Sequence, residues 1–517
     1  MSPSHKKIIF IATGLGAKEE GALSNFAQAR MQQKPNTKTS FYITTTLPYV
    51  NADPHIGFAL ELVYADIFAR HHALAGEAVF FNTGTDEHGA KIYRKAQEAG
   101  VPPQEYVDEY AQKFKNLIKA LDIWEGVNFI RTTDESHKKA AQEFWKRCDA
   151  RGDIYKKNYK MKYCIGCELE KTNSELNEKG QCPLHPDHEI ETINEENYFF
   201  KFSKYQKQLL GFYEKNPNFI IPERRFAEIK AFVGRGLQDF SISRLKEKMP
   251  WGVAVPGDSA HVMYVWFDAL VNYISALEWP DNKEKFNNFW GTVDAPNAVQ
   301  IAGKDNLRQQ SAMWQAMLMS AELLPSKYIV IHGFITSGGQ KMSKSLGNVV
   351  DPVKIIEEYG ADALRYYLAR HVHPVEDSDF TMVKFKEAYN ANLANGLGNL
   401  AARILQMSSQ YFDSPVDIST TREMPEVKKF TENFEFNIAM DSIWSYMRDL
   451  DGLIDEEKPF EVVKKSKKRA QLQVAHLVKE LARITKHLKP FLPETSEKIL
   501  TSIKANQKPG TLFPRKD

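Results

Sequence analysis

Cysteine is the scarcest informative residue in this sequence. Only four cysteines occur among 517 residues, too few to hold together a disulfide-stabilised secreted domain. Cys164, Cys167 and Cys182 fall within one short stretch, and this clustering favours metal binding in a reducing, cytoplasmic compartment. The fourth, Cys148, is expected to be a buried apolar thiol.

Long hydrophobic runs and an excess of one charge are also lacking. No uninterrupted apolar segment approaches the ~18 residues that a membrane span requires, so we expect no membrane partner. Lys and Arg number 68 against 66 Asp and Glu, a net charge of +2, so any polyanion site must be local. The remaining composition is typical of a globular protein, and the length predicts several domains.

Residues 1–38 do not share the pattern of the rest and are predicted to be an extension outside the folded core. Lys6 and Lys7 precede a short apolar run, as in a signal peptide, but no small-residue cleavage site follows. We therefore favour a disordered extension, or an upstream start with Met31 as the true one.

From Phe41 onward, strand and helix patterns alternate. Runs rich in β-formers occupy 41–46, 79–81, 298–302 and 328–331, and helical patterns occupy 56–75, 92–100 and 307–323. Such alternation predicts an α/β fold in which helices cover a parallel sheet. We expect a Rossmann-like, nucleotide-binding domain in two halves, 39–154 and 259–350, split by an insertion at 155–258.

No strand pattern occurs after about Lys384. Apolar residues instead recur at helical spacing, in the sets Leu393, Leu397, Leu400, Ile404 and Val474, Leu477, Leu481, Ile484, Leu488. These amphipathic faces predict an α-helical bundle over 385–517, joined to the α/β region by a linker at 351–384.

The clustered cysteines have the spacing of a metal knuckle within about 160–190. Cys164 and Cys167 form one i, i+3 pair, and Cys182 and His185 form a second. Each pair can chelate one tetrahedral ion, and zinc suits thiolate and imidazole ligands. Four protein ligands leave no open position, so we expect one structural zinc; His188 is the alternative fourth ligand.

Two short motifs are suited to phosphates. His55 and Gly57 lie where a predicted strand hands over to a helix, and a helix N-terminus attracts anions while glycine allows close approach. The second motif is a glycine-flanked loop with two lysines and two hydroxyls, Lys341, Met342, Ser343, Lys344 and Ser345. A loop of this kind can close over a triphosphate and neutralise the leaving pyrophosphate.

Together, these two motifs resemble the paired signatures of the class I aminoacyl-tRNA synthetases. Four further motifs resemble the methionyl-tRNA synthetases in particular: Leu47-Pro48-Tyr49, Gly84-Thr85-Asp86-Glu87-His88-Gly89, Tyr264-Val265-Trp266-Phe267-Asp268-Ala269 and Gly303-Lys304-Asp305. The resemblance covers the chain from Phe41 to its C-terminus.

The resemblance implies a ligase with two steps. Methionine reacts with ATP, accompanied by magnesium, to give methionyl-adenylate and pyrophosphate, and the methionyl group then passes to the 3′-terminal adenosine of methionine tRNA for protein synthesis. The helical bundle would bind the anticodon, and 351–384 would contact the tRNA stem. No oligonucleotide-binding domain follows the bundle, so we expect a monomer.

The resemblance also implies roles for individual residues. The catalytic residues would be His55, Gly57, Lys341 and Lys344, and ATP would also contact Gly303, Asp305, Met342 and Ser343. Methionine would contact Leu47, Tyr49, Asp86, Trp266, Ala269, Tyr273 and Trp314, where aromatic rings suit a polarizable thioether. Asn399, Arg403 and Phe460 would read the anticodon, and the family pattern favours His185 as the fourth zinc ligand.

The sequence departs from the family's usual residues at three positions. Phe58 replaces a second histidine after the glycine, Gln310 replaces a pocket histidine, and Phe460 replaces a tryptophan. We expect an active enzyme, because His55, Asp86 and the two loop lysines are intact.

Other classes of protein share part of the pattern. Synthetases for leucine, isoleucine or valine carry a much longer editing insertion, and one for cysteine would need a metal in the catalytic site. A non-catalytic tRNA-binding relative would have no use for the lysine loop. A stand-alone nucleotidyltransferase would not need the helical bundle.

Overall fold

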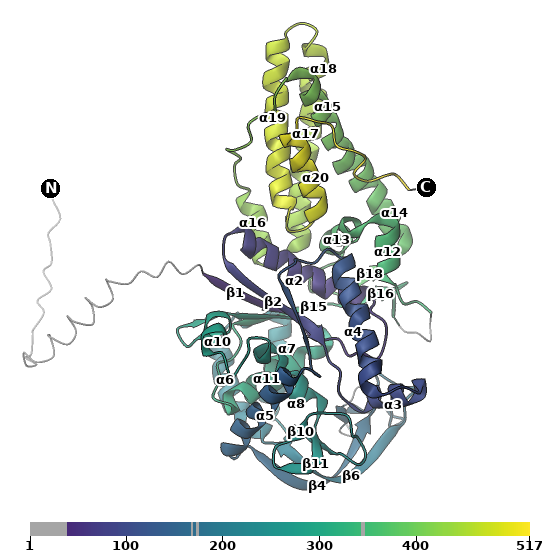
Figure 1. Ribbon diagram of the computed structural model, residues 1–517, viewed down its shortest axis with the longest axis vertical. Helices are drawn as coiled ribbons and strands as arrows, with labels where there is room; N and C mark the ends of the chain where they lie inside the picture. The colour runs from purple at the N-terminus through teal and green to yellow at the C-terminus, as the bar shows by residue number, and fades with distance from the viewer. Residues whose placement is uncertain (1–38, 167–168, 172–174, 343–346, 517) are drawn as a thin grey trace, which may run out of the picture. The chain divides into compact units, whose positions relative to one another are not determined.

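In the computed structural model, which describes residues 39–166, 169–171, 175–342 and 347–516, a parallel sheet lies at the centre of the α/β region (Figure 1). The sheet has six strands in the order β3-β2-β1-β14-β15-β7. Their bounds are β1 Ser40–Thr44, β2 Ala78–Thr85, β3 Val127–Arg131, β7 Ile220–Ile221, β14 Ala298–Gly303 and β15 Tyr328–His332. The Rossmann-like α/β fold expected from the sequence is confirmed.

The strand order places a switch point in the middle of the sheet. From β1 the chain proceeds to β2 and β3 on one side, whereas β14 is followed by β15 on the other. In such sheets, ligands bind beyond the carboxyl ends of the two central strands. The loops that follow β1 and β14 are therefore the natural walls of a binding site.

Helices cover both faces of the sheet, which explains why β1 is buried along its length. Phe41 and Ile43 pack in one core with α2 (Ile56–Leu74), and Tyr42 packs in a second core with α5 (Glu135–Ala150). A strand covered on both faces has an uninterrupted apolar sequence. In β2, a Cβ at Gly84 would lie 1.8 Å from the carbonyl oxygen of Ile130, so only glycine fits there.

Between β3 and β14 the described part of the chain builds two antiparallel sheets of three or more strands, besides the two-stranded hairpin of β12 (Gly291–Thr292) and β13 (Ala295–Pro296). Their orders are β5-β4-β6-β8 and β10-β11-β9. The strands are β4 Ile154–Cys164, β5 Leu169–Lys171, β6 Ile190–Phe200, β8 Phe240–Ser241, β9 Ser243–Leu245, β10 Ala254–Val255 and β11 Asp258–Met263. This segment also supplies β7, the edge strand of the main sheet, which is too short to be predicted from its sequence.

The remaining elements of the α/β region are helices of 3 to 18 residues and the hairpin of β12 and β13. They are α3 Ala90–Ala99, α4 Pro103–Ala120, η2 Phe202–Tyr205, α6 Gln206–Lys215, α7 Glu223–Gly234, α8 Val265–Ala269, α9 Asn272–Ser275, α10 Lys283–Phe289, β12 Gly291–Thr292, β13 Ala295–Pro296, η3 Lys304–Asn306, η4 Gln309–Met313 and α11 Trp314–Ser320.

The helix expected over 307–323 is not regular. Leu307 and Arg308 are α-helical, Gln309–Met313 then forms a π-helix, and α-helical geometry resumes at Trp314. The wider π turn changes which side chains face the sheet, and π turns often occur at functional sites. Hydrophobic spacing alone does not reveal the change in pitch.

Beyond β15 a three-stranded sheet of order β17-β16-β18 precedes the helical bundle. These elements are β16 Ile335–Ser337, β17 Gln340–Lys341, α12 Pro352–Tyr359, α13 Ala361–Arg370, β18 Ser378–Phe380, α14 Met382–Ala388, η5 Tyr389–Gly398, α15 Asn399–Tyr411, α16 Pro425–Glu432, α17 Phe436–Glu457, α18 Pro459–Val462, α19 Lys467–Leu488 and α20 Pro493–Lys504. Both apolar sets predicted from helical spacing are buried, including Leu397 and Leu481 at 0% exposure.

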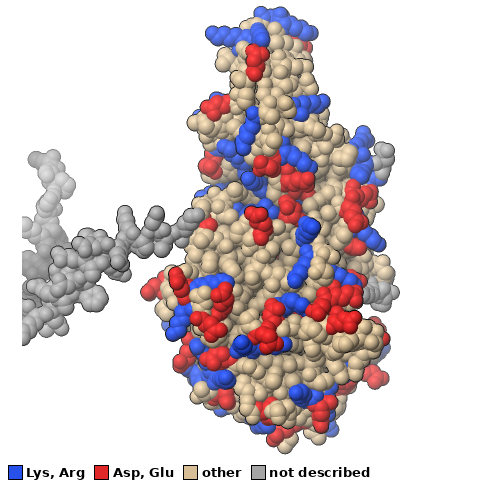
Figure 2. All heavy atoms as spheres, viewed as in Figure 1, with Lys and Arg blue, Asp and Glu red and all other residues tan. Residues whose placement is uncertain are grey.

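The face seen in Figure 2 carries cationic and anionic side chains side by side, in keeping with the small net charge. Cationic side chains gather at the end of the bundle where α18 lies (Figures 1 and 2). Within the described ranges, no helix has the length and apolar character needed to cross a membrane.

Candidate active site

A cavity of about 660 Å³ opens at the switch point of the sheet. Its walls come from the loops after β1, β2, β14 and β15, from α8 and α9, and from the knuckle segment. Most of the residues expected to bind methionine or ATP line this cavity: Leu47, Tyr49, Asp86, Trp266, Ala269, Tyr273, Asp305 and Lys341. The tertiary structure thus gathers segments that are up to about 300 residues apart in the chain.

His55 is the N-cap of α2. Its Nδ1 accepts a hydrogen bond from the backbone N–H of Gly57 at 3.1 Å. The proton of the neutral ring therefore lies on Nε2, where it can be donated to a ligand. Burial and, to a smaller extent, the positive charge of Lys341 together lower the pKa of His55 to about 4, so the ring is neutral at pH 7.

The absence of a side chain at Gly57 leaves the space that the His55 ring occupies. A Cβ at position 57 would lie 2.9 Å from His55 Cε1, so any side chain there would displace the imidazole. Gly303, at the end of β14, is similarly restricted, since a Cβ would lie 2.7 Å from Asp305 Oδ1. Neither position therefore has room for a side chain beside the group that it faces.

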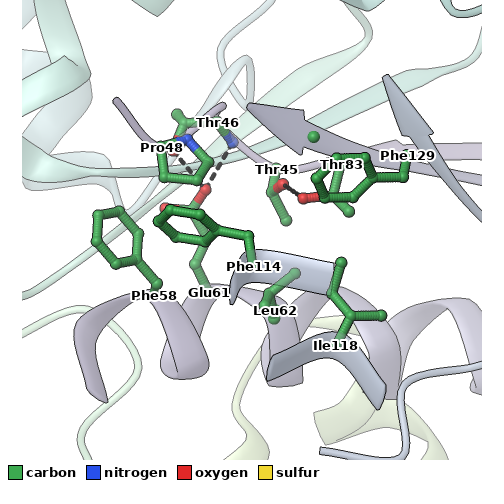
Figure 3. Close-up of a pocket in the computed structure, with 11 residues that line it drawn as sticks. Thr45, Thr46, Pro48, Phe58, Glu61, Leu62, Thr83, Phe114, Ile118 and Phe129 are labelled. Carbon is green, nitrogen blue, oxygen red and sulfur yellow. Dashed lines mark hydrogen bonds between the residues drawn. The ribbon is translucent and has the colours of Figure 1, made fainter. Parts of the chain in front are cut away.

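Phe58, at the position of the family's second histidine, stacks on His55 with ring centroids 4.4 Å apart and packs edge-on against Phe114. Figure 3 shows it beside Glu61 in the wall of a small cavity below the loop that follows β1. The Phe58 ring therefore holds the plane of the His55 imidazole by packing, without a hydrogen bond.

Glu61 and His332 form a buried pair that the sequence did not predict. The Glu61 carboxylate accepts hydrogen bonds from the backbone N–H and the hydroxyl of Thr46, both at 2.6 Å, and from His332 Nε2 at 2.9 Å. Burial alone would lower the pKa of His332, but the hydrogen bond and charge of Glu61 outweigh it and raise the pKa. The pair ties the loop after β1 to the end of β15.

Trp314 is the one expected methionine contact that does not line the cavity. It is fully buried and packs behind Tyr273, with ring centroids 5.9 Å apart, and against Phe144. Gln310, in the π turn, lines the cavity instead and donates a hydrogen bond to the Tyr273 hydroxyl at 2.6 Å.

A second unpredicted group supports the wall that carries Trp266 and Ala269. Asp268, on the same short helix, is fully buried and bonded to His88 Nδ1 at 2.6 Å and His137 Nε2 at 2.8 Å. Burial alone would raise the pKa of Asp268, but the two histidines outweigh it and lower the pKa to about 2. The supporting role of His88 can be recognised only from its contact with Asp268. Because Asp268 is 180 residues away in the chain, the sequence does not reveal this contact.

Three side chains that could hold a metal ion meet in the knuckle segment. Ligand atoms of Cys164, Cys182 and His185 all lie within 4.8 Å of one another. Two thiols and an imidazole suit a borderline-soft ion. Cys167 lies outside the described residues, as do Ser343 and Lys344 of the lysine loop. Met342 is half-buried against the core near α2, while Lys341 is exposed at the end of β17.

In the helical bundle, Asn399 is exposed at the start of α15. Arg403, one turn later, forms ion pairs with Asp451 at 2.6 Å and Asp455 at 3.1 Å. Asp455 lies near the end of α17, and Phe460, in the short helix α18 that follows, is 44% exposed. Asn399 and Phe460 are thus exposed, whereas the partly exposed Arg403 is held by two aspartates of α17.

Comparison with known proteins gives one consistent family. The family described as "tRNA synthetases class I (M)" matches residues 41–192 and 186–405. A methionine–tRNA ligase from Nostoc sp. is 41% identical over 475 residues, which are 89% of each chain. One from Thermotoga maritima is 39% identical over 91% of this chain and 76% of its own. A solved structure of Mycobacterium tuberculosis methionyl-tRNA synthetase in complex with methionyl-adenylate has a TM-score of 0.83 and 34% identity, covering 93% of this chain and 99% of that one.

Proposed function

Because this chain belongs to the methionyl-tRNA synthetases of class I, we propose that the cavity at its switch point holds methionine and ATP together. The enzyme activates methionine with ATP to methionyl-adenylate and charges tRNA with the product. The observation that carries the assignment of the site is the convergence of Tyr49, Asp86, Trp266, Tyr273 and Lys341 on one cavity.

His55 binds ATP as a neutral donor. Its Nε2–H points away from the bond that Nδ1 makes with Gly57 and donates to a phosphate oxygen. Lys341, with Lys344 from the same loop, stabilises the charge that develops on the leaving pyrophosphate, which is the usual way in which phosphoryl transfer is catalysed. Asp305 and the open backbone at Gly303 hold the remainder of the nucleotide, which enters with magnesium.

Methionine lies on the opposite wall. The carboxylate of Asp86 pairs with the α-ammonium group, which leaves the substrate carboxylate to attack the α-phosphate and expel pyrophosphate. The rings of Tyr49, Trp266 and Tyr273 surround the thioether, because sulfur gains from aromatic contact. Leu47 and Ala269 complete the apolar wall, and Trp314 supports Tyr273 from behind.

The direct test is amino-acid-dependent ATP–pyrophosphate exchange by purified protein, with methionine compared against leucine, isoleucine, valine and cysteine. We expect exchange with methionine alone. No exchange with any of them, in folded and metal-loaded protein, would support a non-catalytic tRNA binder instead.

One zinc ion fits the knuckle, with Cys164, Cys167, Cys182 and His185 as its four ligands. A closed set of thiolates and imidazole holds this metal tetrahedrally and supplies local folding energy. The insertion, 155–258, would then present a rigid surface beside the active site to the acceptor end of tRNA.

Metal content tests this ligand set. We expect one zinc per chain by elemental analysis, lost in Cys182→Ser, with faster proteolysis confined to 160–190. Cys148→Ser is the matched control, because that thiol is buried against the backbone of Met317 and should leave zinc unchanged. Full zinc occupancy in Cys182→Ser would contradict the assignment.

The bundle, 385–517, reads the anticodon through Asn399, Arg403 and Phe460. Unstacked bases suit an exposed aromatic ring and a guanidinium plane. The linker 351–384 contacts the tRNA stem, and the enzyme works as a monomer in the cytoplasm, where its product is used.

Replacing Arg403 by alanine should separate the two steps. We expect kcat/KM for tRNA charging to fall about tenfold to a hundredfold, the value of one lost base contact, while methionine-dependent exchange is unchanged. Arg448→Ala, an exposed arginine on α17, should leave both reactions intact. An equal loss of exchange in Arg403→Ala would indicate a folding defect and refute the role.

A further inference from the structure

The end of the helical bundle carries the densest run of positive charge in the chain. Five of the six residues from 464 to 469 are Lys or Arg, and no other six-residue stretch of the sequence holds as many. They occupy the connection between α18 and α19 and the first turn of α19, at the cationic end of the bundle in Figures 1 and 2. We call this segment the cationic turn. Its five cations are all exposed: Lys464, Lys465, Lys467, Lys468 and Arg469.

Contacts on the inner side hold the cationic turn in place. Val462 and Val463, which precede it, pack against the core of the bundle, and Ala470, which follows it, is fully buried. The side-chain amide of Gln471 donates a hydrogen bond to the backbone carbonyl of Tyr411, at the end of α15, at 2.7 Å. The cations are therefore carried by a packed part of the bundle.

These charges do not stabilise the fold itself. The first turn of α19 contains three cations and no acidic side chain, and cations at the positive end of a helix dipole are unfavourable. None of the five cations forms an ion pair with a described carboxylate, whereas Lys498 of α20 pairs with Glu494 at 2.6 Å. Residues that break a local rule without a compensating contact are expected where a protein serves a function, and here the missing partner is an anion.

An RNA backbone suits this surface better than a membrane does. A helix that binds a membrane surface needs a broad apolar face, but the apolar face of α19 is buried inside the bundle at Val474 and Leu477. Leu472 is the only large apolar side chain that is exposed on α19, all of which is described. Phosphodiesters need only accessible cations. Phe460, which the proposed function places against an anticodon base, is four residues before Lys464.

We propose that the cationic turn binds the phosphate backbone of tRNA beside the anticodon and supplies a share of the affinity that does not depend on base sequence. The inference rests on the proposed anticodon-binding role of the bundle and adds a second kind of contact to it. Arg403 and Phe460 contact bases, whereas the cationic turn positions the backbone. Because the neutralised phosphates release counterions, this share of the affinity weakens as the salt concentration rises.

The test replaces three of the lysines in the full chain, as Lys464→Gln/Lys467→Gln/Lys468→Gln. Ser466 and Arg469 are kept, because the Ser466 hydroxyl caps α19 by accepting from the backbone N–H of Arg469. The dissociation constant for a methionine tRNA transcript is measured between about 50 and 200 mM salt. We expect weaker binding and a plot of log affinity against log salt whose slope is smaller by about 2 to 3. An unchanged slope would overturn the proposal.

Two sets of matched variants show whether the effect belongs to charge at this place. Arginine at the same three positions keeps the charge and should keep the slope. Lys207→Gln/Lys215→Gln/Lys283→Gln removes three exposed lysines from α6 and α10 and should also leave the slope unchanged. An equal decrease of the slope in this second set would overturn the proposal, since the effect would then follow from net charge alone.

Three further readouts separate this role from others. The unfolding midpoint of the glutamine variant should stay the same or rise, because cations leave a helix N-terminus; a fall would indicate a structural role and overturn the proposal. A tRNA with an altered anticodon should lose affinity by the same factor, and a loss confined to the methionine anticodon would overturn it. Loss of binding to phosphatidylserine vesicles, with an unchanged tRNA slope, would assign the surface to a membrane instead.

Failure of the proposed function remains distinguishable from failure of this inference. Methionine-dependent ATP–pyrophosphate exchange needs no tRNA, so the glutamine variant should retain it in full. If the wild-type protein shows no exchange, the catalytic proposal fails, while the salt dependence of tRNA binding still tests the cationic turn.

Discussion

Replacing His55 by alanine is expected to lower kcat/KM for methionine-dependent ATP–pyrophosphate exchange by about 10²–10³-fold, the usual loss when one donor to a developing oxyanion is removed. The KM for methionine should change little, because His55 is not among the residues that line the methionine wall. The measurement is steady-state exchange at varied ATP.

Two matched variants separate phosphate binding from helix capping. Asparagine and aspartate both cap helices well, so both should keep the stability that alanine loses, about 1 kcal/mol. Only asparagine keeps an N–H donor, and aspartate adds a charge that repels phosphate. We therefore expect His55→Asn to retain much of the exchange and His55→Asp to lose it. Equal activity in the two would refute donation by His55.

The pKa of His55 also predicts a pH profile. Because burial lowers it to about 4, the free enzyme keeps the neutral ring through pH 6–7, and kcat/KM for ATP should show no inflection there from this residue. As the pH falls from 6.5 to 4, the unfolded chain binds a proton that the folded chain does not, so the stability contribution of His55 declines over that window. An inflection near 6.5 that disappears in His55→Asn would contradict this.

Replacing Arg365 by leucine is expected to reduce the free energy of unfolding by about 3–5 kcal/mol, the cost of breaking a buried ion pair on one side. Arg365 is fully buried in α13 and pairs with Asp66 of α2 at 2.7 Å. It also donates to the backbone carbonyls of Pro490 and Phe491, both at 2.9 Å, in the turn before α20. One side chain thus joins the sheet-covering helix to the last two helices of the bundle.

Denaturant unfolding, followed by the shift in midpoint, measures this effect. The double variant Asp66→Asn/Arg365→Leu should recover part of the loss. It removes the buried carboxylate that has lost one of its two arginine partners, Arg365 and Arg70, while the oxygen that accepts from the backbone N–H of Trp124 remains. Lys498→Leu breaks an exposed pair with Glu494 nearby and should change stability by less than about 1 kcal/mol. A similar loss in both single variants would show that burial is not the cause.

Much of this protein could be predicted from its sequence, because the signals concerned are local. The strands at β1, β2, β14 and β15 follow from runs of β-formers, and the faces of α15 and α19 follow from apolar residues at helical spacing. The spacing of the candidate metal ligands in the knuckle and the capping position of His55 depend only on neighbours a few residues away.

Contacts between distant segments were decided by the tertiary structure. The edge strand β7 forms only because two of its residues pair with β15. The π turn that places Gln310 beside Tyr273 cannot be recognised from hydrophobic spacing. The Glu61–His332 pair joins residues 271 positions apart, and Arg365 meets carbonyls more than a hundred residues away. Which polar residues pair in this way depends on which of them the folded chain buries next to one another, since a buried donor or charge must be paired. The spacing of residues along the sequence does not contain that information.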